Sequence, residues 1–410
     1  MRNVAVIGAG MTRFGKYLDR SMKDLGREAV EGAEKAAGVA HKDIEAAVVG
    51  NSMAGIVTGQ ESIRGQVILR EMGFGDIPIV NTENACASSA TAFHIGWLYV
   101  ASGMYDCVLT LGVEKLYHED KKVSYAAIGS AVDVEAMREA ARKAKEAADR
   151  AATESRQVGE GAGEKRSMFM DFYAAGARNH MKKYGTTKEQ FAKVAVKNHL
   201  HGSLNPHAQY QDTCSLEDVL MSPLVVEPLT RLMCSPIGDG AAAAIICSEE
   251  KARQFTANPI WVKASVLTSG MDLQPGDDPA ATRASQRAYE IAGVTPRDLD
   301  VLEVHDASAP AEIMIYEEIG LCPEGEGGRL IDEGATQLGG KQPVNTSGGL
   351  LAKGHPVGAT GVAQIAEVYW QLKGEAGDRQ VEGAKVGLTE NGGGAVRGEP
   401  AAMSVHILST

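Results

Sequence analysis

Cys86 is the residue of this sequence best placed to act as a nucleophile. It follows an apolar run, Ile77–Val80, which we read as a strand, and it precedes an apolar segment, Ala90–Val100, with the composition of a buried helix. We therefore expect Cys86 in the first helical turn after a strand, with Asn81 or Asn84 as the helix cap. Helix N-termini present free N–H groups and a partial positive charge, and both favour the nucleophilic thiolate. A buried structural cysteine is the alternative interpretation.

The second stretch whose residues could take part in catalysis is a glycine-rich loop that carries His355. The loop runs from Asn345 to Gly361, and an apolar helix is predicted after it, from Val362 to Leu372. A cysteine and a histidine can form a nucleophile and its base. This second stretch therefore weakens the interpretation of Cys86 as a merely structural residue.

Two more polar stretches end predicted strands. One holds His305 and Asp306, which can bind a water or an oxyanion. The other holds five candidate residues for binding an oxyanion or the substrate: Glu390, Asn391, Gly392, Gly393 and Gly394. Consecutive glycines can present backbone N–H groups to a developing negative charge.

The elements that must position these residues repeat along the chain. Ala292-Gly293-Val294 echoes Ala37-Gly38-Val39, and Val344-Asn345-Thr346 echoes Val80-Asn81-Thr82. The period is far too long for a solenoid. We expect two related α/β halves with a pseudo-two-fold axis, and a site between them where the His355 loop is the counterpart of the Cys86 turn.

The N-terminal strand invites a different interpretation, because Gly8 and Gly10 follow Val4–Ile7 as in a dinucleotide-binding fold. That fingerprint needs a third glycine at position 13, where the chain has Arg13. We therefore prefer a first strand followed by a tight turn, without a nicotinamide site.

The middle of the chain, residues 117–230, differs in character from both halves. We predict a solvated helix over 131–154, a Gly/Glu-rich loop over 157–164, and further helices over 168–184 and 188–199. A polar loop is predicted over 198–207, and the spacing of its three histidines matches no standard metal site, so we expect no metal. We interpret the whole region as an insertion that covers the core.

Composition restricts the class of protein. A chain of 410 residues, 44% hydrophobic and 23% charged, indicates a globular protein of more than one domain. The net charge of -12 argues against nucleic acid as a partner. No apolar run is long enough to span a bilayer, so we expect no membrane partner. Six scattered cysteines without a Cys-x-x-Cys pair indicate a reducing, cytoplasmic location.

Four features together resemble the thiolase superfamily: the cysteine turn, the Gly-His-Pro-x-Gly-x-x-Gly loop around His355, the His305-Asp306 strand end and the terminal triple glycine. The histidine at position 305 resembles the branch that contains the sterol carrier protein type and the archaeal thiolases, because biosynthetic thiolases have an asparagine at this position. Three stretches also match that branch: Tyr184–Thr187, Asn198-His199 and Asn205-Pro206-x-Ala208-Gln209-Tyr210.

The resemblance covers essentially the whole chain and implies an α/β fold of duplicated, five-layered α-β-α-β-α type. The N-terminal half would comprise residues 1–116 and 231–270, and the C-terminal half would comprise 271–410. Residues 117–230 would form an inserted loop domain.

The resemblance also implies a mechanism. Cys86, activated by His355, would attack the keto carbon of a 3-ketoacyl-CoA, and the Cα–Cβ bond would break. His355 and a water held by His305 would stabilise the leaving enolate, while the triple glycine and the Cys86 N–H would form the other oxyanion hole. A second coenzyme A would then take the acyl group. Coenzyme A is thus a substrate, and no tightly bound cofactor is implied.

One part of the thiolase pattern is missing. Thiolases usually have a second cysteine that protonates the enolate, either just before the terminal glycines or just after the His-Asp pair. This chain has Glu390-Asn391 at the first place and Ala307 at the second. The proton donor therefore stays open, with Glu390, His305 and a water as candidates.

Three other functions compete with thiolysis. A decarboxylating ketoacyl synthase can use one cysteine and two histidines, although the His355-Pro356 pair favours a thiolase. A retro-aldol lyase and a non-catalytic acyl-CoA-binding subunit are less consistent with an intact Cys86. The branch further implies a homodimer, a small partner with a zinc ribbon and an OB fold, and benzoylsuccinyl-CoA or acetoacetyl-CoA as substrate.

Overall fold

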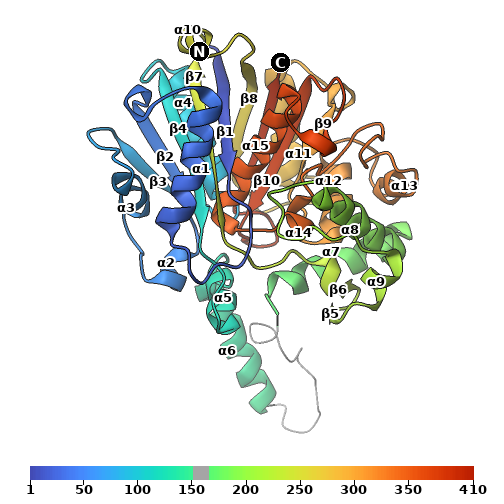
Figure 1. Cartoon of the computed structure of the whole chain (residues 1–410). Coiled ribbons are helices and arrows are strands. Elements are labelled where there is room, and N and C mark those ends of the chain that lie inside the picture. Colours follow the sequence, from blue (N-terminus) through green and yellow to red (C-terminus); the bar gives the residue numbers. More distant parts are fainter. Residues whose placement is uncertain (151–165) are drawn as a thin grey trace.

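One mixed sheet of nine strands runs through the molecule in the order β3-β2-β4-β7-β1-β8-β11-β10-β9 (Figure 1). The computed structural model describes residues 1–150 and 166–410. The first part of the chain forms β1 (Val4–Met11), α1 (Met22–Ala37), β2 (Ala46–Gly50), α2 (Ala54–Thr58), α3 (Arg64–Glu71), β3 (Ile79–Thr82), α4 (Ser88–Ala101) and β4 (Cys107–Glu114).

The middle of the chain forms helices and one small two-stranded sheet. Its elements are α5 (Lys121–Ile128), α6 (Val134–Arg150), α7 (Phe169–Tyr184), α8 (Lys188–Ser203), α9 (Leu216–Met221), β5 (Leu224–Val226) and β6 (Leu229–Thr230). The predicted Gly/Glu-rich loop over 157–164 lies outside the described residues, as does the end of the helix predicted over 131–154.

The rest of the chain returns to the large sheet. Its elements are β7 (Gly240–Ser248), α10 (Glu249–Phe255), β8 (Ile260–Thr268), α11 (Ala280–Ala292), β9 (Val301–Glu303), α12 (Ala309–Glu318), α13 (Gly327–Asp332), α14 (Gly349–Ala352), α15 (Thr360–Lys373), β10 (Val386–Gly393) and β11 (Ala402–Ser409).

The sheet consists of two halves joined by a narrow contact. β1 and β8 meet over two residue pairs, Ala5–Trp261 and Val6–Ile260. By contrast, β1 pairs with β7 along its whole length, and β8 does the same with β11. The halves are therefore β3-β2-β4-β7-β1 and β8-β11-β10-β9.

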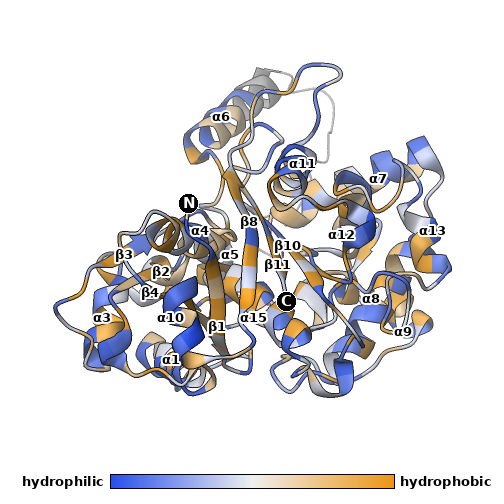
Figure 2. Cartoon of the chain, turned by 90° about the horizontal axis from the view of Figure 1, so that it is seen from above, coloured by the Kyte–Doolittle hydropathy of each residue, from blue (hydrophilic) through white to orange (hydrophobic). Residues whose placement is uncertain are grey.

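Helices cover the outer faces of both half-sheets and also lie between them. Because side chains alternate along a strand, Val4 and Val6 of β1 join the apolar core around α4 and α15, while Ala5 and Ile7 face α1. The second half-sheet packs against α11 and α12 on its outer side. Figure 2 shows apolar residues on β1 and β8 and hydrophilic residues on the exposed side of α10. This layering is the α-β-α-β-α arrangement of the thiolase fold.

The internal repeat is visible in matching helix ends. α1 ends at Gly38 with φ of 69°, and α11 ends at Gly293 with φ of 68°. In each case the following valine amide bonds back to the helix at 3.2 Å, and glycine is favoured because the left-handed conformation strains other residues. A parallel bridge between Leu302 and Val344 repeats the pairing of Val48 with Val80.

Gly8 and Gly10 do not form the tight turn that we predicted. Both lie inside β1, where a Cβ atom at either position would overlap the backbone of α1. The glycines let α1 lie directly on the strand, and this close approach, rather than a turn, explains them.

The predicted loop over 198–207 was wrong in its first part, because α8 continues to Ser203. Asn198 and His201 are buried on this helix. A polar sequence is read as a loop when it faces water. Here Asn198 donates to Asp306 and Glu312, and His201 lies against the Asn345 carbonyl of the His355 loop.

The division of the chain at residue 270 stays a prediction. The pairing of β8 with β11 favours an earlier boundary, before Ile260, because it places β8 in the second half-sheet.

Among the described residues, no helix is both long and apolar enough to cross a membrane. The predicted cytoplasmic location also stays a prediction.

Candidate active site

Cys86 lies at a sharp turn between β3 and α4, two residues before the helix begins. Ala85 has a positive φ of 47°, and the amide of Ser88 donates to the Ala85 carbonyl at 3.1 Å. The predicted asparagine cap is absent, since α4 follows Ala87 without a side-chain cap. Asn84 donates to Thr91 Oγ1 at 2.8 Å, which ties the turn to the first turn of the helix.

The expectation of a preformed thiolate was wrong. Burial raises the pKa of Cys86 to about 12, and the carboxylates of Glu114 and Glu83 raise it further. Hydrogen bonds from the Gly394 and Cys86 amides lower the pKa without offsetting the burial. The resting group is therefore the thiol, and a neighbouring base would have to take its proton before the sulfur could act as a nucleophile.

His355 is oriented to be that base. Its Nδ1 lies 2.7 Å from the Thr360 hydroxyl, which itself donates to the Pro356 carbonyl at 3.1 Å. The hydroxyl oxygen therefore accepts the Nδ1 proton, and the Nε2 lone pair is left free for the site. Burial first, and then His305 and Lys353, hold the pKa of His355 well below its ordinary value, so the imidazole is neutral.

Three reactive side chains converge on one point. The Cys86 Sγ and a ring nitrogen from each of His305 and His355 all lie within 4.8 Å of one another. The two imidazole rings meet edge to face, with centroids 5.2 Å apart. The same three atoms are chemically able to ligate a metal ion, and the absence of a metal site stays a prediction.

His305 is held as a hydrogen-bond donor toward the cavity. Its Nδ1 accepts from Asn391 Nδ2 at 3.2 Å, which in this orientation of the amide places the ring proton on Nε2. Its backbone N–H donates to Glu390 Oε2 at 2.9 Å. Burial lowers the pKa of His305 to about 4, so the ring is neutral.

The terminal glycines divide into two groups. Gly392 and Gly394 line the cavity, and the Gly394 amide bonds the sulfur of Cys86. Gly393 does not line the cavity, because it packs against the backbone of the Cys86 turn at Asn84 and Ala87. The amides of Gly394 and Cys86 thus both lie beside the sulfur, which makes them the candidate donors of an oxyanion hole for a thioester at Cys86.

The packing of Gly393 yields a prediction. In a Gly393→Ala variant, the new Cβ would collide with the Asn84 carbonyl and displace the Cys86 turn. We expect alkylation of Cys86 to slow by on the order of tenfold, which corresponds to a misplacement cost of about 1.4 kcal/mol. Timed alkylation followed by mass spectrometry checks this. Gly75→Ala is a suitable control, because Gly75 has no neighbour within 4 Å and no positive φ. An equal effect in both variants would contradict the prediction.

Asp306 does not line the cavity, and its binding of a water or an oxyanion stays a prediction. It accepts from the amide of Leu350 at 2.6 Å and from Asn198 Nδ2 at 2.8 Å. Asp306 therefore anchors the short helix α14, which precedes His355 in the loop.

The loop domain braces the His355 loop through contacts that the sequence did not predict. From α8, Lys197 Nζ donates to the Val344 carbonyl at 2.7 Å, and His201 Nδ1 lies 3.0 Å from the Asn345 carbonyl. Asn205, just after α8, donates to the Ser347 carbonyl at 2.8 Å. The only sequence signal was that Asn198-His199 and Asn205-Pro206 match the family pattern.

A buried ion pair was also missed. Lys353 Nζ lies 3.2 Å from Glu303 Oε2, and both side chains are inaccessible to solvent. Ser347 completes the cluster, since its hydroxyl donates to the same Glu303 oxygen at 2.6 Å. Removing one partner would leave a buried charge unpaired, so the pair holds the Ser347–Lys353 part of the loop in place.

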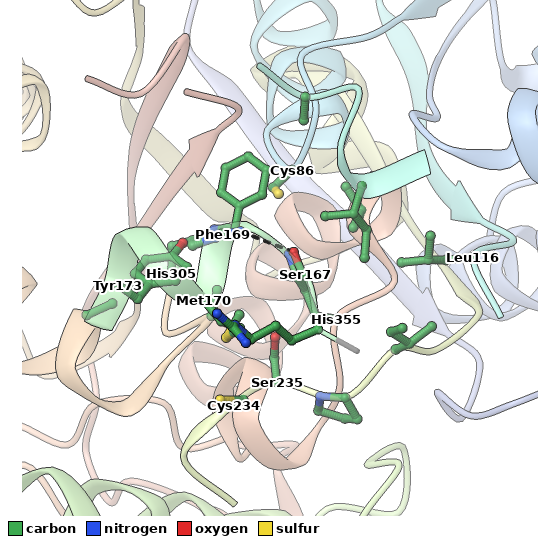
Figure 3. Close-up of a pocket in the computed structure, with 18 of the residues that line it drawn as sticks. Cys86, Leu116, Ser167, Phe169, Met170, Tyr173, Cys234, Ser235, His305 and His355 are labelled. Atoms are coloured by element: carbon green, nitrogen blue, oxygen red, sulfur yellow. Dashed lines mark hydrogen bonds between the residues drawn. The ribbon is translucent and has the colours of Figure 1, made fainter. Parts of the chain in front are cut away.

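A cavity of about 540 Å³ opens onto the three reactive side chains. Figure 3 shows Phe169, Met170 and Tyr173 reaching into it from α7, across from Cys86, His305 and His355. Its walls are mostly apolar, and three exposed basic side chains also contribute to them: Lys16, Lys121 and Arg231.

Comparison with known proteins agrees with this geometry. The family model for the thiolase N-terminal domain matches residues 4–250, and that for the thiolase C-terminal domain matches 267–410. The chain is 43% identical to the acetyl-CoA acetyltransferase of Methanothermobacter thermautotrophicus, with 100% of each chain covered. It is 36% identical to human sterol carrier protein 2, over 95% of this chain and 70% of that protein.

Solved structures show the same fold. The Ltp2-ChsH2(DUF35) aldolase superposes with a TM-score of 0.78 at 24% identity, covering 100% of this chain and 98% of that one. Human mitochondrial 3-ketoacyl-CoA thiolase in complex with CoA superposes with a TM-score of 0.68 at 19% identity, with the same coverage. From the family models, the relatives and the fold, the chain belongs to the thiolase family, as the sequence motifs predicted.

Proposed function

We propose that this protein cleaves or forms 3-ketoacyl-CoA by acyl transfer through a thioester on Cys86. The observation that carries the proposal is the convergence of Cys86, His305 and His355 within 4.8 Å, beside the amide of Gly394. Family membership supports an acyltransferase of the thiolase type. The proposal covers the cysteine mechanism as well as the reaction.

In this mechanism the Cys86 thiol transfers its proton to His355 Nε2 as the sulfur attacks the keto carbon. The amides of Gly394 and Cys86 donate to the oxyanion that forms. The Cα–Cβ bond then breaks, and the Nε2–H of His305 donates to the oxygen of the departing enolate. Coenzyme A finally takes the acyl group from Cys86, so it serves as a substrate.

The shape and charge of the cavity support coenzyme A thioesters as ligands. Lys16, Lys121 and Arg231 supply positive charge for phosphate groups on an otherwise acidic protein. The apolar wall suits an acyl chain. The absence of a tightly bound cofactor is part of the proposal, and benzoylsuccinyl-CoA and acetoacetyl-CoA are the first substrates to try.

Assembly forms part of the same proposal. We expect a homodimer, as the family resemblance implies, and a small zinc-ribbon and OB-fold partner. One structural neighbour, the Ltp2-ChsH2(DUF35) aldolase, is named for two components. The protein would act in the cytoplasm, without nucleic acid or membrane partners.

Replacing His305 should separate the two halves of the reaction. In His305→Ala, we expect C–C cleavage to fall by about 10²–10³, the usual cost of removing one oxyanion donor. Acylation of Cys86 by a simple acyl-CoA should persist, because no enolate forms in that step. Rapid-quench mass spectrometry of Cys86 and assay of ketoacyl-CoA cleavage measure the two separately. Equal loss of both would make His305 the base, and full activity in both would remove it from the site.

A substrate panel tests the function itself. Purified protein, with and without the small partner, is incubated with coenzyme A and a series of 3-ketoacyl-CoAs, and shortened acyl-CoAs are identified by mass spectrometry. Turnover of malonyl-CoA would instead indicate a decarboxylating synthase. Cleavage of side-chain hydroxyacyl-CoAs without a Cys86 adduct would indicate a retro-aldol lyase. Binding without turnover across the panel would indicate a non-catalytic subunit.

A further inference from the structure

The wall of the active-site cavity contains a carboxyl group whose bonding is incomplete. Glu390 lies within β10, lines the cavity and has no solvent-accessible surface. Its Oε2 accepts the His305 amide at 2.9 Å. Its Oε1 is buried and has no hydrogen-bond partner within the described ranges. A buried polar atom without a partner is costly, and the cost is lower when the site completes the bond during its work.

The surroundings keep this carboxyl group protonated. Burial, and the acidic side chain of Glu318 on α12, raise the pKa of Glu390 to about 8, against the opposing effect of the His305 amide. The other titratable groups that face it are Tyr173 on α7 and His305, and neither is charged near neutral pH. Because Oε2 accepts an N–H, the acidic proton belongs on Oε1, the oxygen without a partner.

We propose that Glu390 is the acid that protonates the α-carbon of the departing acyl-CoA enolate, and this assignment rests on the proposed thiolase function. When the Cα–Cβ bond breaks, its electron pair passes to the enolate, and the α-carbon takes the proton from Glu390 Oε1. Glu390 becomes a carboxylate. The incoming coenzyme A thiol returns a proton to it, and His355 returns its proton to Cys86 as the acyl group leaves.

His305 is a poorer candidate for this step. Its ring is neutral, so giving up its Nε2 proton would leave an imidazolate anion inside a buried site. Giving up the Oε1 proton leaves a carboxylate that already accepts one N–H. The geometry therefore assigns hydrogen bonding to His305 and proton transfer to Glu390.

The test uses the full chain with Glu390→Gln, Glu390→Asp and Glu318→Gln. Three readouts are compared: acylation of Cys86 by a simple acyl-CoA, C–C cleavage, and incorporation of deuterium from D₂O into the methyl group of acetyl-CoA. We expect Glu390→Gln to acylate normally, and to lose cleavage and deuterium exchange by about 10²–10⁴, the scale of general acid–base effects. Glu390→Asp should recover part of both. Thermal unfolding checks that each variant is folded.

The pH profile provides a readout that a structural role would not move. The acid form is present below the pKa, so cleavage should fall as pH rises through about 8, while Cys86 acylation should not. Glu318→Gln removes the neighbour that raises this pKa, and should move the fall to lower pH. The residual cleavage of Glu390→Gln should lack this fall.

Three outcomes overturn the assignment. Cleavage and exchange by Glu390→Gln within tenfold of the wild type would make water the proton donor. Parallel loss of acylation in a folded Glu390→Gln would mean that Glu390 supports the site as a whole. A wild type that never acylates Cys86 would remove the proposed function, and the assignment with it. That last result is distinguished from the first two because it is seen without any substitution.

Discussion

A Cys86→Ala variant should form no acyl adduct, and its turnover should fall by at least about 10⁴-fold, the scale observed when a hydrolase loses its nucleophile. The reason is geometric, since the Cys86 sulfur is the atom bonded by the Gly394 amide and grouped with His305 and His355. Intact-mass spectrometry after brief exposure to a 3-ketoacyl-CoA shows the adduct, and peptide mapping locates it.

Another cysteine provides the control. Cys214 is only partly buried and does not line the cavity, so Cys214→Ala should keep both adduct and turnover. Cys234 does line the cavity, and its sulfur donates to the Thr230 carbonyl at 3.4 Å. A full adduct on Cys86→Ala, carried by Cys234, would contradict the assignment of the nucleophile.

The proximity of Cys86 and His355 could be predicted because the internal repeat can be recognised in the sequence. Val344-Asn345-Thr346 copies Val80-Asn81-Thr82, and a duplicated sheet brings the ends of equivalent strands together. The ends of α1 depend on local hydrogen bonds alone, since Ser21 caps its first turn and Gly38 ends it.

The contacts that fix the site could not be predicted, because they join residues far apart in sequence. Lys353 meets Glu303 across 50 positions, and Asn198 meets Asp306 across 108. Nothing in the local pattern of α8 says that its polar side chains face the His355 loop. The polar stretch was therefore read as a solvated loop, although its first part is a buried helical face.

The predicted ionisation of Cys86 was wrong for a related reason. The helix N-terminus near Cys86 was expected to stabilise a thiolate, but burial has the larger effect and raises the pKa to about 12. Burial depends on how the loop domain covers the cavity, and sequence does not reveal that. Glu390 illustrates the same point, because its position was noted in the sequence, while its pKa is raised first by its burial and then by Glu318.

Replacing His355 should show that the thiol depends on a neighbouring base. In His355→Ala, alkylation of Cys86 by iodoacetamide at neutral pH should slow by at least about tenfold, and turnover should fall by about 10²–10⁴. With a pKa of about 12, an unassisted Cys86 thiol is almost entirely protonated at neutral pH, and only the thiolate reacts.

The pH dependence of alkylation makes this prediction specific. In the wild type, the low pKa of His355 keeps the base neutral, so the rate should be nearly constant from about pH 6 to about pH 8. In His355→Ala the rate should rise by about tenfold per pH unit, because only the thiolate fraction reacts. Thr360→Val, which removes the partner of Nδ1, should give an intermediate rate. An unchanged rate and a shared pH profile in His355→Ala would show that His355 is not the base.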